Sequence, residues 1–253
     1  MTRKAIGIVG FGRFGQVLHR LFKAGFEIKV SSSTYKPGDI AGVDFASLKE
    51  TIRASDAIFL TVPINKMGET ATRMKPFLTP GQVVVDVCSI KEYSYGVLKK
   101  ALEENEVHIW PTHPMFGPDS AKNGFQGLRW VSCEEDIDVG RVQPYLDYID
   151  QKGLAIVRVS CQEHDRLAAR TQGLAHLIGR VMEEVGIERT QIDTAGFEKL
   201  IELKEQTCND SWELFSDLQY YNEYSQENEE KLQKAINKVF SSLNAFRDTQ
   251  GKR

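Results

Sequence analysis

Hydrophobic residues follow two different periods along this chain of 253 residues. Up to about residue 160, short runs rich in Val, Ile and Phe alternate with stretches in which apolar residues recur every three or four positions. This alternation is typical of βαβ units, in which helices connect parallel strands. We predict seven strands, over residues 5–10, 27–32, 57–63, 82–87, 107–111, 128–133 and 155–160.

The period changes after Glu163. Apolar residues from Leu167 to Val185 recur at three- and four-residue steps, which predicts one long amphipathic helix, and strand-like runs almost vanish beyond it. We therefore predict an α/β fold: a Rossmann-like domain with a mostly parallel sheet over residues 1–160, then an all-α domain over residues 161–253. The apolar stripes of the helical half favour a dimerisation domain.

Composition excludes several classes of protein. The net charge is −3 and there is no basic stripe, which argues against a nucleic-acid partner. The four cysteines lack C-x-x-C spacing, which argues against a zinc site or a disulfide framework. No leader-like segment precedes the first strand, and no apolar stretch reaches bilayer-spanning length. We expect a cytoplasmic protein with no membrane partner and no metal.

A glycine motif follows the first strand directly. Gly10, Gly12 and Gly15 have the spacing G-x-G-x-x-G and open a helix with apolar positions. Such glycines allow a tight turn and a close approach of the backbone to a pyrophosphate, which the helix N-terminus attracts. We predict dinucleotide binding by these glycines and by Arg13 and Phe14 between them.

The end of the second strand indicates which dinucleotide binds. A carboxylate there would bind the ribose hydroxyl of NAD, but the chain has hydroxyls and a lysine that can hold a 2′-phosphate. We predict NADP, with NAD as the alternative, bound by Ser31, Ser32, Ser33 and Lys36. The alternatives are that these are ordinary loop residues, or that Asp39 favours NAD. 

One histidine is a candidate general base. In WPTHPMFGPDS, His113 stands among turn-forming residues that include Gly117 and Pro118, so we expect a rigid loop to present it. Histidine titrates near neutral pH and can accept a substrate proton. The alternative is a loop histidine whose hydrogen bonds are satisfied by the backbone.

Four further motifs accompany the glycine turn: DVCSIKE (86–92), THPMFGPDS (112–120), EHDRLAARTQGLAHLIGRVM (163–182) and NDSWELF (209–215). Together they resemble the prephenate and arogenate dehydrogenase family over nearly the whole chain, and the plant-type arogenate dehydrogenase branch most. The resemblance implies a homodimer that oxidises and decarboxylates a cyclohexadienol. The expected substrate is L-arogenate, which becomes tyrosine; the alternative is prephenate, which becomes 4-hydroxyphenylpyruvate.

The resemblance also implies roles for residues of the first domain. His113 would be the base, and Ser89 would orient both this base and the substrate hydroxyl. Ser89 could instead cap a helix that starts near Lys91. Val62 and Pro63 end another strand at the same edge, so we expect them to lie beside the nicotinamide. The alternative is that they only connect the strand to the following loop.

In the helical half, Gln172, His176 and Arg180 are four residues apart and share one helix face. Small neighbours, Gly173 and Gly179, suggest room for a ligand. The resemblance implies that Gln172 and His176 contact the substrate; a polar contact between helices is the alternative. For Arg180, an ion pair with an acidic neighbour is the stronger alternative.

The choice of substrate depends on one carboxylate. Prephenate-specific relatives carry an arginine near the place of Glu202, whereas Asp210 of this chain can pair with the ammonium group of arogenate. The resemblance implies an acid here in arogenate users and an amide in prephenate users. Asp210 could instead cap a helix that starts at Ser211. For the substrate carboxylates, the open candidates are Lys122, Arg129, Lys199 and Lys204.

Two hypotheses place the protein outside this family. A β-hydroxyacid dehydrogenase would share the two-domain architecture but would leave the HPMFGP loop unexplained. A non-enzymatic NADP-sensing module would keep its role and its cofactor affinity when His113 is replaced by Asn, whereas an enzyme would lose turnover.

Overall fold

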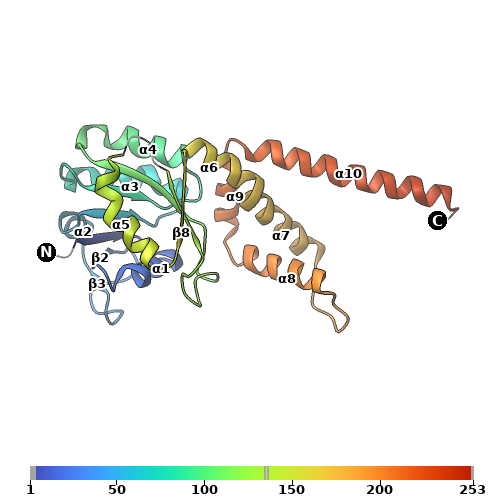
Figure 1. The fold of residues 1–253 in the computed structure, drawn as a ribbon, viewed down its shortest axis with the longest axis horizontal. Helices are drawn as coiled ribbons and strands as arrows, with labels where there is room; N and C mark the ends of the chain where they lie inside the picture. The colour runs from blue at the N-terminus through green and yellow to red at the C-terminus, as the bar shows by residue number, and fades with distance from the viewer. Residues whose placement is uncertain (1–3, 134, 136, 252–253) are drawn as a thin grey trace. The chain divides into compact units, whose positions relative to one another are not determined.

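The computed structural model describes residues 4–133, 135 and 137–251 (Figure 1). The chain divides into two compact units, Met1–His164 and Asp165–Arg253, which we call unit 1 and unit 2. None of the described helices is both long enough and apolar enough to cross a membrane.

Unit 1 contains a mostly parallel sheet, as predicted; it has eight strands rather than seven, in the order β3-β2-β1-β4-β5-β6-β7-β8. Only the pairing of β6 with β7 is antiparallel among the described strand pairs. All four residues of β4 and all four of β5 are buried, as expected of central parallel strands covered on both faces. The strands are β1 (Ala5–Val9), β2 (Glu27–Ser31), β3 (Asp44–Phe45), β4 (Ala57–Leu60), β5 (Val83–Asp86), β6 (His108–Pro114), β7 (Arg129–Cys133) and β8 (Ala155–Val159).

Helices join these strands and pack on the sheet around an aromatic core. Phe22, Trp110, Trp130 and Tyr145 are among its largest fully buried side chains. The helices of unit 1 are α1 (Arg13–Phe22), α2 (Leu48–Arg53), α3 (Met67–Met74), α4 (Glu92–Leu102) and α5 (Val139–Gln151).

The expectation that a loop holds His113 is wrong, because this residue lies inside β6. Residues 108–111 pair with β5, and Thr112, His113 and Pro114 then pair with β7 on the other side. The prolines of this segment lack an N–H group, but their carbonyls can still accept, so a strand is possible at this change of partner. His113 therefore sits on a sheet, which is a more rigid support than a loop.

Unit 2 is helical, and its first helix is not uniform. The helix predicted over Leu167 to Val185 is the end of α6 (Cys161–Ala168), a π-helical turn (Ala169–Gly173) and α7 (Leu174–Val185) in succession. Single π turns inside α-helices are frequent at functional sites, and this one contains Gln172. The remaining helices are α8 (Ala195–Cys208), α9 (Trp212–Tyr220) and α10 (Ser225–Thr249).

Gly179 serves helix packing, so the prediction that it leaves room for a ligand is wrong. A Cβ atom at Gly179 would lie 1.9 Å from Oγ1 of Thr207 on α8. The thiol of Cys208 also reaches the carbonyl oxygen of Gly179, at 3.6 Å. The missing side chain thus allows α7 and α8 to approach closely, and the neighbouring helix fills the space.

Candidate functional site

The predicted cofactor and catalytic residues of unit 1 gather at one edge of the sheet. Because β1, β4, β5 and β6 run parallel, their carboxyl ends meet there. The hydroxyl of Thr61 donates to the carbonyl of Gly10 at 2.7 Å, and the thiol of Cys88 reaches the carbonyl of Val62 at 3.8 Å. These contacts join the ends of three neighbouring strands into one surface.

The glycine turn fits a dinucleotide. Gly10 has φ of +100°, and a Cβ atom there would lie 2.5 Å from the carbonyl oxygen of Thr61. A Cβ at Gly15 would lie 2.6 Å from the carbonyl oxygen of Gly10, whereas one at Gly12 would meet nothing within 4 Å. Gly12 precedes α1, whose first turn holds no acidic residue. The N–H groups at the N-terminus of α1 can therefore bind a pyrophosphate.

The segment after β2 forms a turn with hydroxyl and ammonium groups. The hydroxyl oxygen of Ser32 accepts from the N–H groups of Thr34 and Tyr35, both at 3.1 Å. Ser32 and Lys36 also line a cavity of about 770 Å³. The carboxylate of Asp39 accepts from the N–H of Lys36 at 2.8 Å, so it is used to close a turn.

The chain beyond β6 packs against α1. Asp119 forms an exposed ion pair with Arg13 at 3.0 Å, and the Phe14 and Phe116 rings have centroids 6.1 Å apart. The THPMFGPDS motif and the glycine-motif helix are therefore neighbours. The Arg13 guanidinium contacts Asp119, so the predicted contact of Arg13 with a cofactor would compete with this ion pair.

His113 is buried and has a histidine partner that sequence reasoning missed. Its side chain lies 2.8 Å from that of His164, between Nδ1 of His113 and Nε2 of His164, and both residues are 4% exposed. A hydrogen bond at one ring nitrogen fixes the orientation and the tautomer of an imidazole. With Nδ1 bonded to His164, Nε2 is the other ring nitrogen of His113. The EHD motif contains His164, but nothing in its spacing pointed to His113.

Ser89 does not cap a helix. It is half-buried between β5 and α4, and the residue that precedes α4 is Lys91, which makes no capping hydrogen bond through its side chain. In the part of the chain that the structure describes, the Ser89 hydroxyl has no hydrogen-bond partner. The structure thus removes the capping alternative, and it does not join Ser89 to His113.

Sequence reasoning also missed a buried ion pair that contacts β6. Lys91 and Asp86 are 0% exposed; the ammonium group donates to the carboxylate and to the carbonyl of Thr112, the latter at 2.6 Å. The Asp86 carboxylate also accepts from the hydroxyl of Ser94 and, at 2.8 Å, from the N–H of Cys88. Although burial opposes a charge here, the Asp86 carboxylate keeps the pKa of Lys91 above its ordinary value. The network anchors the residue that precedes His113.

In unit 2 the structure places Asp210 beside the polar face of α7. Nη2 of Arg180 donates to the main-chain carbonyl of Asp210 at 2.5 Å. Burial lowers the pKa of His176; the Asp210 carboxylate opposes this shift and the Arg180 guanidinium adds to it. The predicted residues His176 and Asp210 are therefore within electrostatic reach of each other.

The structure differs from both alternatives, helix capping by Asp210 and an acidic partner for Arg180. The helix α9 is capped by Ser211, whose hydroxyl accepts from the N–H of Leu214 at 3.1 Å, so Asp210 is not the cap. Arg180 bonds a carbonyl rather than a side-chain carboxylate, so the acidic pairing suggested for it is wrong among the described residues. Neither helix capping by Asp210 nor an acidic partner of Arg180 is therefore found among the described residues.

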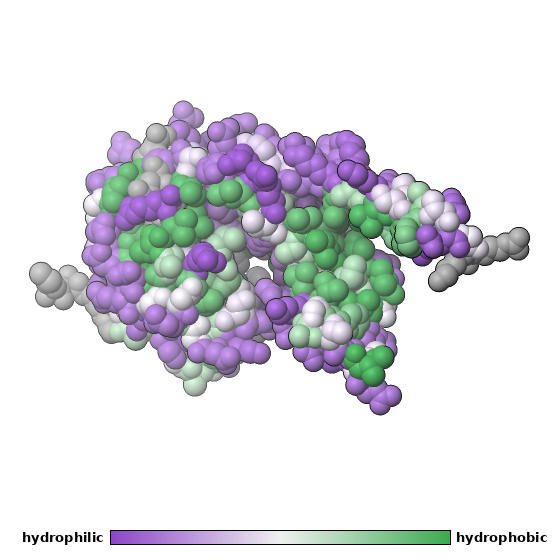
Figure 2. Space-filling view, turned by 45° about the vertical axis from the view of Figure 1, so that its right-hand side comes forward, coloured by the Kyte–Doolittle hydropathy of each residue, from purple (hydrophilic) through white to green (hydrophobic). Residues whose placement is uncertain are grey.

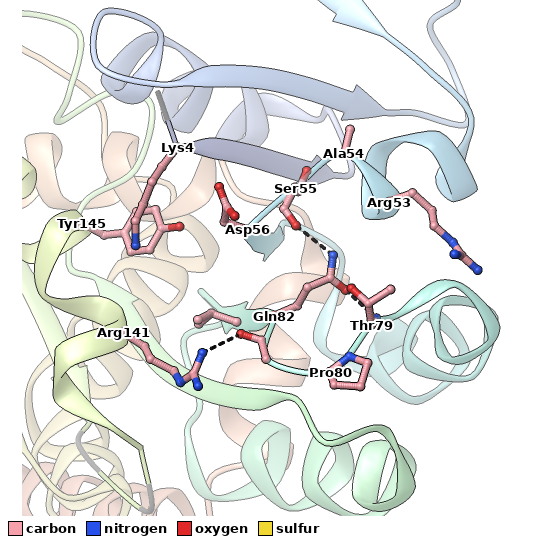
Figure 3. A pocket seen from close by; sticks show the side chains of 12 residues that line it. Lys4, Arg53, Ala54, Ser55, Asp56, Thr79, Pro80, Gln82, Arg141 and Tyr145 are labelled. Atoms are coloured by element: carbon pink, nitrogen blue, oxygen red, sulfur yellow. Dashed lines mark hydrogen bonds between the residues drawn. The ribbon is translucent and has the colours of Figure 1, made fainter. Parts of the chain in front are cut away.

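A cavity of about 440 Å³ lies elsewhere in unit 1 (Figure 3). Its lining includes Lys4, Asp56 and Gln82, which precede β1, β4 and β5, together with Arg141 and Tyr145 of α5. The predicted residues follow these strands instead. No predicted catalytic or cofactor-binding residue lines this cavity, which lies where the amino ends of the parallel strands meet.

Comparison with known proteins gives a match to a family model in each half of the chain. Residues 28–155 match the family model of the prephenate dehydrogenase nucleotide-binding domain, and residues 181–252 match that of the TYRAAT1-like C-terminal domain. The chain is 33% and 34% identical to chloroplastic arogenate dehydrogenases 1 and 2 of Arabidopsis thaliana, over 96% and 94% of its length. It spans 39% of the first relative and 69% of the second.

Solved structures show the same fold. A prephenate dehydrogenase from A. aeolicus, in complex with hydroxyphenyl propionate and NAD+, superposes with a TM-score of 0.76 at 17% identity, covering 99% of this chain and 94% of that one. The arogenate dehydrogenase of Synechocystis superposes with a TM-score of 0.67 at 19% identity, covering 98% of both chains.

Proposed function

The chain belongs to the prephenate and arogenate dehydrogenase family, and from this premise we propose that it is an NADP-dependent arogenate dehydrogenase that forms L-tyrosine. The observation that carries the proposal is the buried His113–His164 pair, at the sheet edge where the glycine turn also lies. The test is the absorbance of reduced cofactor when purified protein meets L-arogenate or prephenate, each with NADP or NAD. Turnover of prephenate alone would support the alternative substrate.

His113 has the arrangement of a general base. We propose that its Nε2 removes the proton of the ring hydroxyl while His164 holds the imidazole in place. The carbon that bears this oxygen loses a hydride and becomes a carbonyl carbon; bound NADP supplies the acceptor for that hydride. The ring carboxylate leaves as carbon dioxide, and its bonding electrons restore the aromatic ring. Ser89 is proposed to orient the substrate hydroxyl.

Gln172, His176 and Asp210 are proposed to bind the substrate, and Asp210 to select arogenate. Asp210→Asn should lower kcat/KM for arogenate about 10- to 100-fold, because it removes a charge-assisted bond to the ammonium group. Prephenate turnover should rise, since the substitution also removes a carboxylate that repels its side chain. Ser211 caps α9, so the helix keeps its cap in this variant. Equal losses with both substrates would contradict the proposed selection.

We propose NADP as the cofactor because hydroxyls and Lys36 follow β2 where a carboxylate would select NAD. Ser32→Asp should raise KM for NADP about tenfold or more relative to NAD, because a carboxylate repels the 2′-phosphate. Aspartate can still accept from the N–H groups of Thr34 and Tyr35, so the turn is kept. Ser32→Asn is the uncharged control. A preference for NADP that stays the same in Ser32→Asp would count against this assignment.

We propose that unit 2 pairs with a second copy of the chain. Hydrophobic residues gather on the surface of its helices (Figure 2). Along α10, Val239, Phe240, Leu243 and Phe246 are between 41% and 67% exposed and recur at helical spacing. An exposed apolar stripe of this kind, which no other element of the described chain covers, is typical of a dimer surface.

Phe240→Glu should convert the proposed dimer into a monomer, because a charge in an apolar interface loses its water without gaining a partner. Light scattering after size-exclusion chromatography measures the mass. Lys238→Glu changes a neighbouring exposed polar position and should leave the dimer intact. A wild-type chain that is monomeric at micromolar concentration would contradict the proposal.

A further inference from the structure

The contact between His113 and His164 restricts where each ring carries its hydrogen. Nδ1 of His113 lies 2.8 Å from Nε2 of His164, so one of these nitrogens donates a hydrogen bond and the other accepts it. If Nε2 of His113 is to take a proton, it must be bare, and the neutral ring then carries its hydrogen on Nδ1. His164 must therefore accept through Nε2. The opposite arrangement places a hydrogen on Nε2 of His113 and leaves no base.

Burial makes a positive charge on His113 alone unfavourable. His113 and His164 are each 4% exposed, and their ring centroids are 5.0 Å apart. An imidazolium without surrounding water loses much of its stabilisation. The second imidazole offers a nitrogen of the same chemical type at hydrogen-bond distance, so a proton can move between the rings at little cost.

The elements around the pair carry further charged or titratable groups. They are Asp86 of β5, Lys91 and Tyr95 at α4, Arg129 and Cys133 of β7, and Cys161, Glu163 and Asp165 of α6. Lys91 and Asp86 pair with each other, and a hydrogen bond with the Cys133 thiol, together with burial, raises the pKa of the Cys161 thiol. All of these groups are the same in the wild-type chain and in the variants below, so a difference between them reports the histidine pair.

We infer that His164 takes up the charge that His113 receives, so that the pair, rather than His113 alone, acts as the base. The substrate O–H bond breaks and an N–H bond forms at Nε2 of His113, while the hydrogen on Nδ1 of His113 passes to Nε2 of His164. His164 then carries hydrogen on both nitrogens and holds the positive charge. After product release the hydrogens move back, and water removes the proton from Nε2 of His113. This role rests on the proposed function, which supplies the substrate hydroxyl; because His164 acts through His113, it is a positioning residue.

Nitrogen NMR of the full chain, with isotopically labelled histidine, tests the pair without turnover. While the pair is neutral, His113 should show a hydrogen on Nδ1 and a bare Nε2. As the pH falls, His113 and His164 should respond together, each with part of a complete imidazole titration, because they share one proton. In His164→Gln, His113 should show the complete change, since an amide oxygen accepts a hydrogen bond but takes no proton at these pH values.

Two results of this titration would overturn the inference. One is a hydrogen on Nε2 of the neutral His113. The other is a complete titration of His113 in the wild-type chain with no response of His164. Both are measured on the wild-type chain, so they decide the question even if the variant does not fold.

Steady-state kinetics separates proton uptake by His164 from simple orientation of the His113 ring. His164→Gln keeps an acceptor for Nδ1 of His113, and it should still lower kcat for arogenate about 10- to 100-fold with KM within about threefold. The matched control is His108→Gln, which changes a histidine at the opposite end of β6 and should leave kcat unchanged. A kcat of His164→Gln within about threefold of wild type would show that His164 only orients the ring. If the NMR signals show a shared proton in a protein that fails to oxidise arogenate, only the proposed function falls.

Discussion

Replacing His113 with asparagine is expected to lower kcat for arogenate by about 10²- to 10⁴-fold, the usual contribution of a general base. Asparagine is close to histidine in size and polarity but cannot accept the hydroxyl proton. The dissociation constant of NADP should stay within about threefold, because the proposed cofactor contacts lie in the glycine turn and at the N-terminus of α1. Steady-state kinetics and fluorescence titration measure the two quantities.

The control for this variant is His108→Asn. His108 begins the same strand, β6, and is therefore at the end of that strand opposite to His113. Its loss should leave kcat unchanged. If His113→Asn kept more than about a tenth of the activity, or if both variants lost it equally, His113 would not be the base. Lost turnover with cofactor binding retained would also speak against a non-enzymatic sensing module.

Replacing Lys91 with methionine is expected to lower the free energy of unfolding by about 3–5 kcal/mol, because the Asp86 carboxylate would stay buried without its cation. The pKa of Lys91 is raised above its ordinary value of 10.5, so the pair contributes fully below that pH and is lost only as the pH rises beyond it. Urea unfolding at pH 7 therefore measures the whole effect. The second substitution Asp86→Asn should recover part of the loss, since it removes the uncompensated charge.

An exposed ion pair supplies the comparison. Lys29 contacts Asp44 at 2.6 Å, with side chains 38% and 58% exposed, so Lys29→Met should cost at most about 1 kcal/mol. Equal losses in Lys91→Met and Lys29→Met would show that burial gives the Lys91–Asp86 pair no special role. We also expect a lower kcat in Lys91→Met, because the ammonium group anchors the carbonyl of Thr112 beside His113.

Local patterns predicted much of unit 1. The apolar runs predicted seven of the eight strands, and the missed one, β3, has two residues and no apolar run of its own. The glycine spacing predicted the turn after β1, since Gly10 has a positive φ and a Cβ atom at Gly15 would meet the carbonyl of Gly10, five residues earlier. Both requirements lie within a few consecutive residues, which a sequence displays directly.

The sequence by itself thus determined the fold class, the glycine turn and the identity of the candidate base. Only the tertiary structure decided which residues meet: His164 is 51 positions from His113, and Thr207 fills the space beside Gly179 from another helix. It also decided that His113 lies in a strand, because the pairing with β7 comes from residues about 20 positions further along. Contacts between distant segments arise from packing of the whole chain, and no local pattern encodes them.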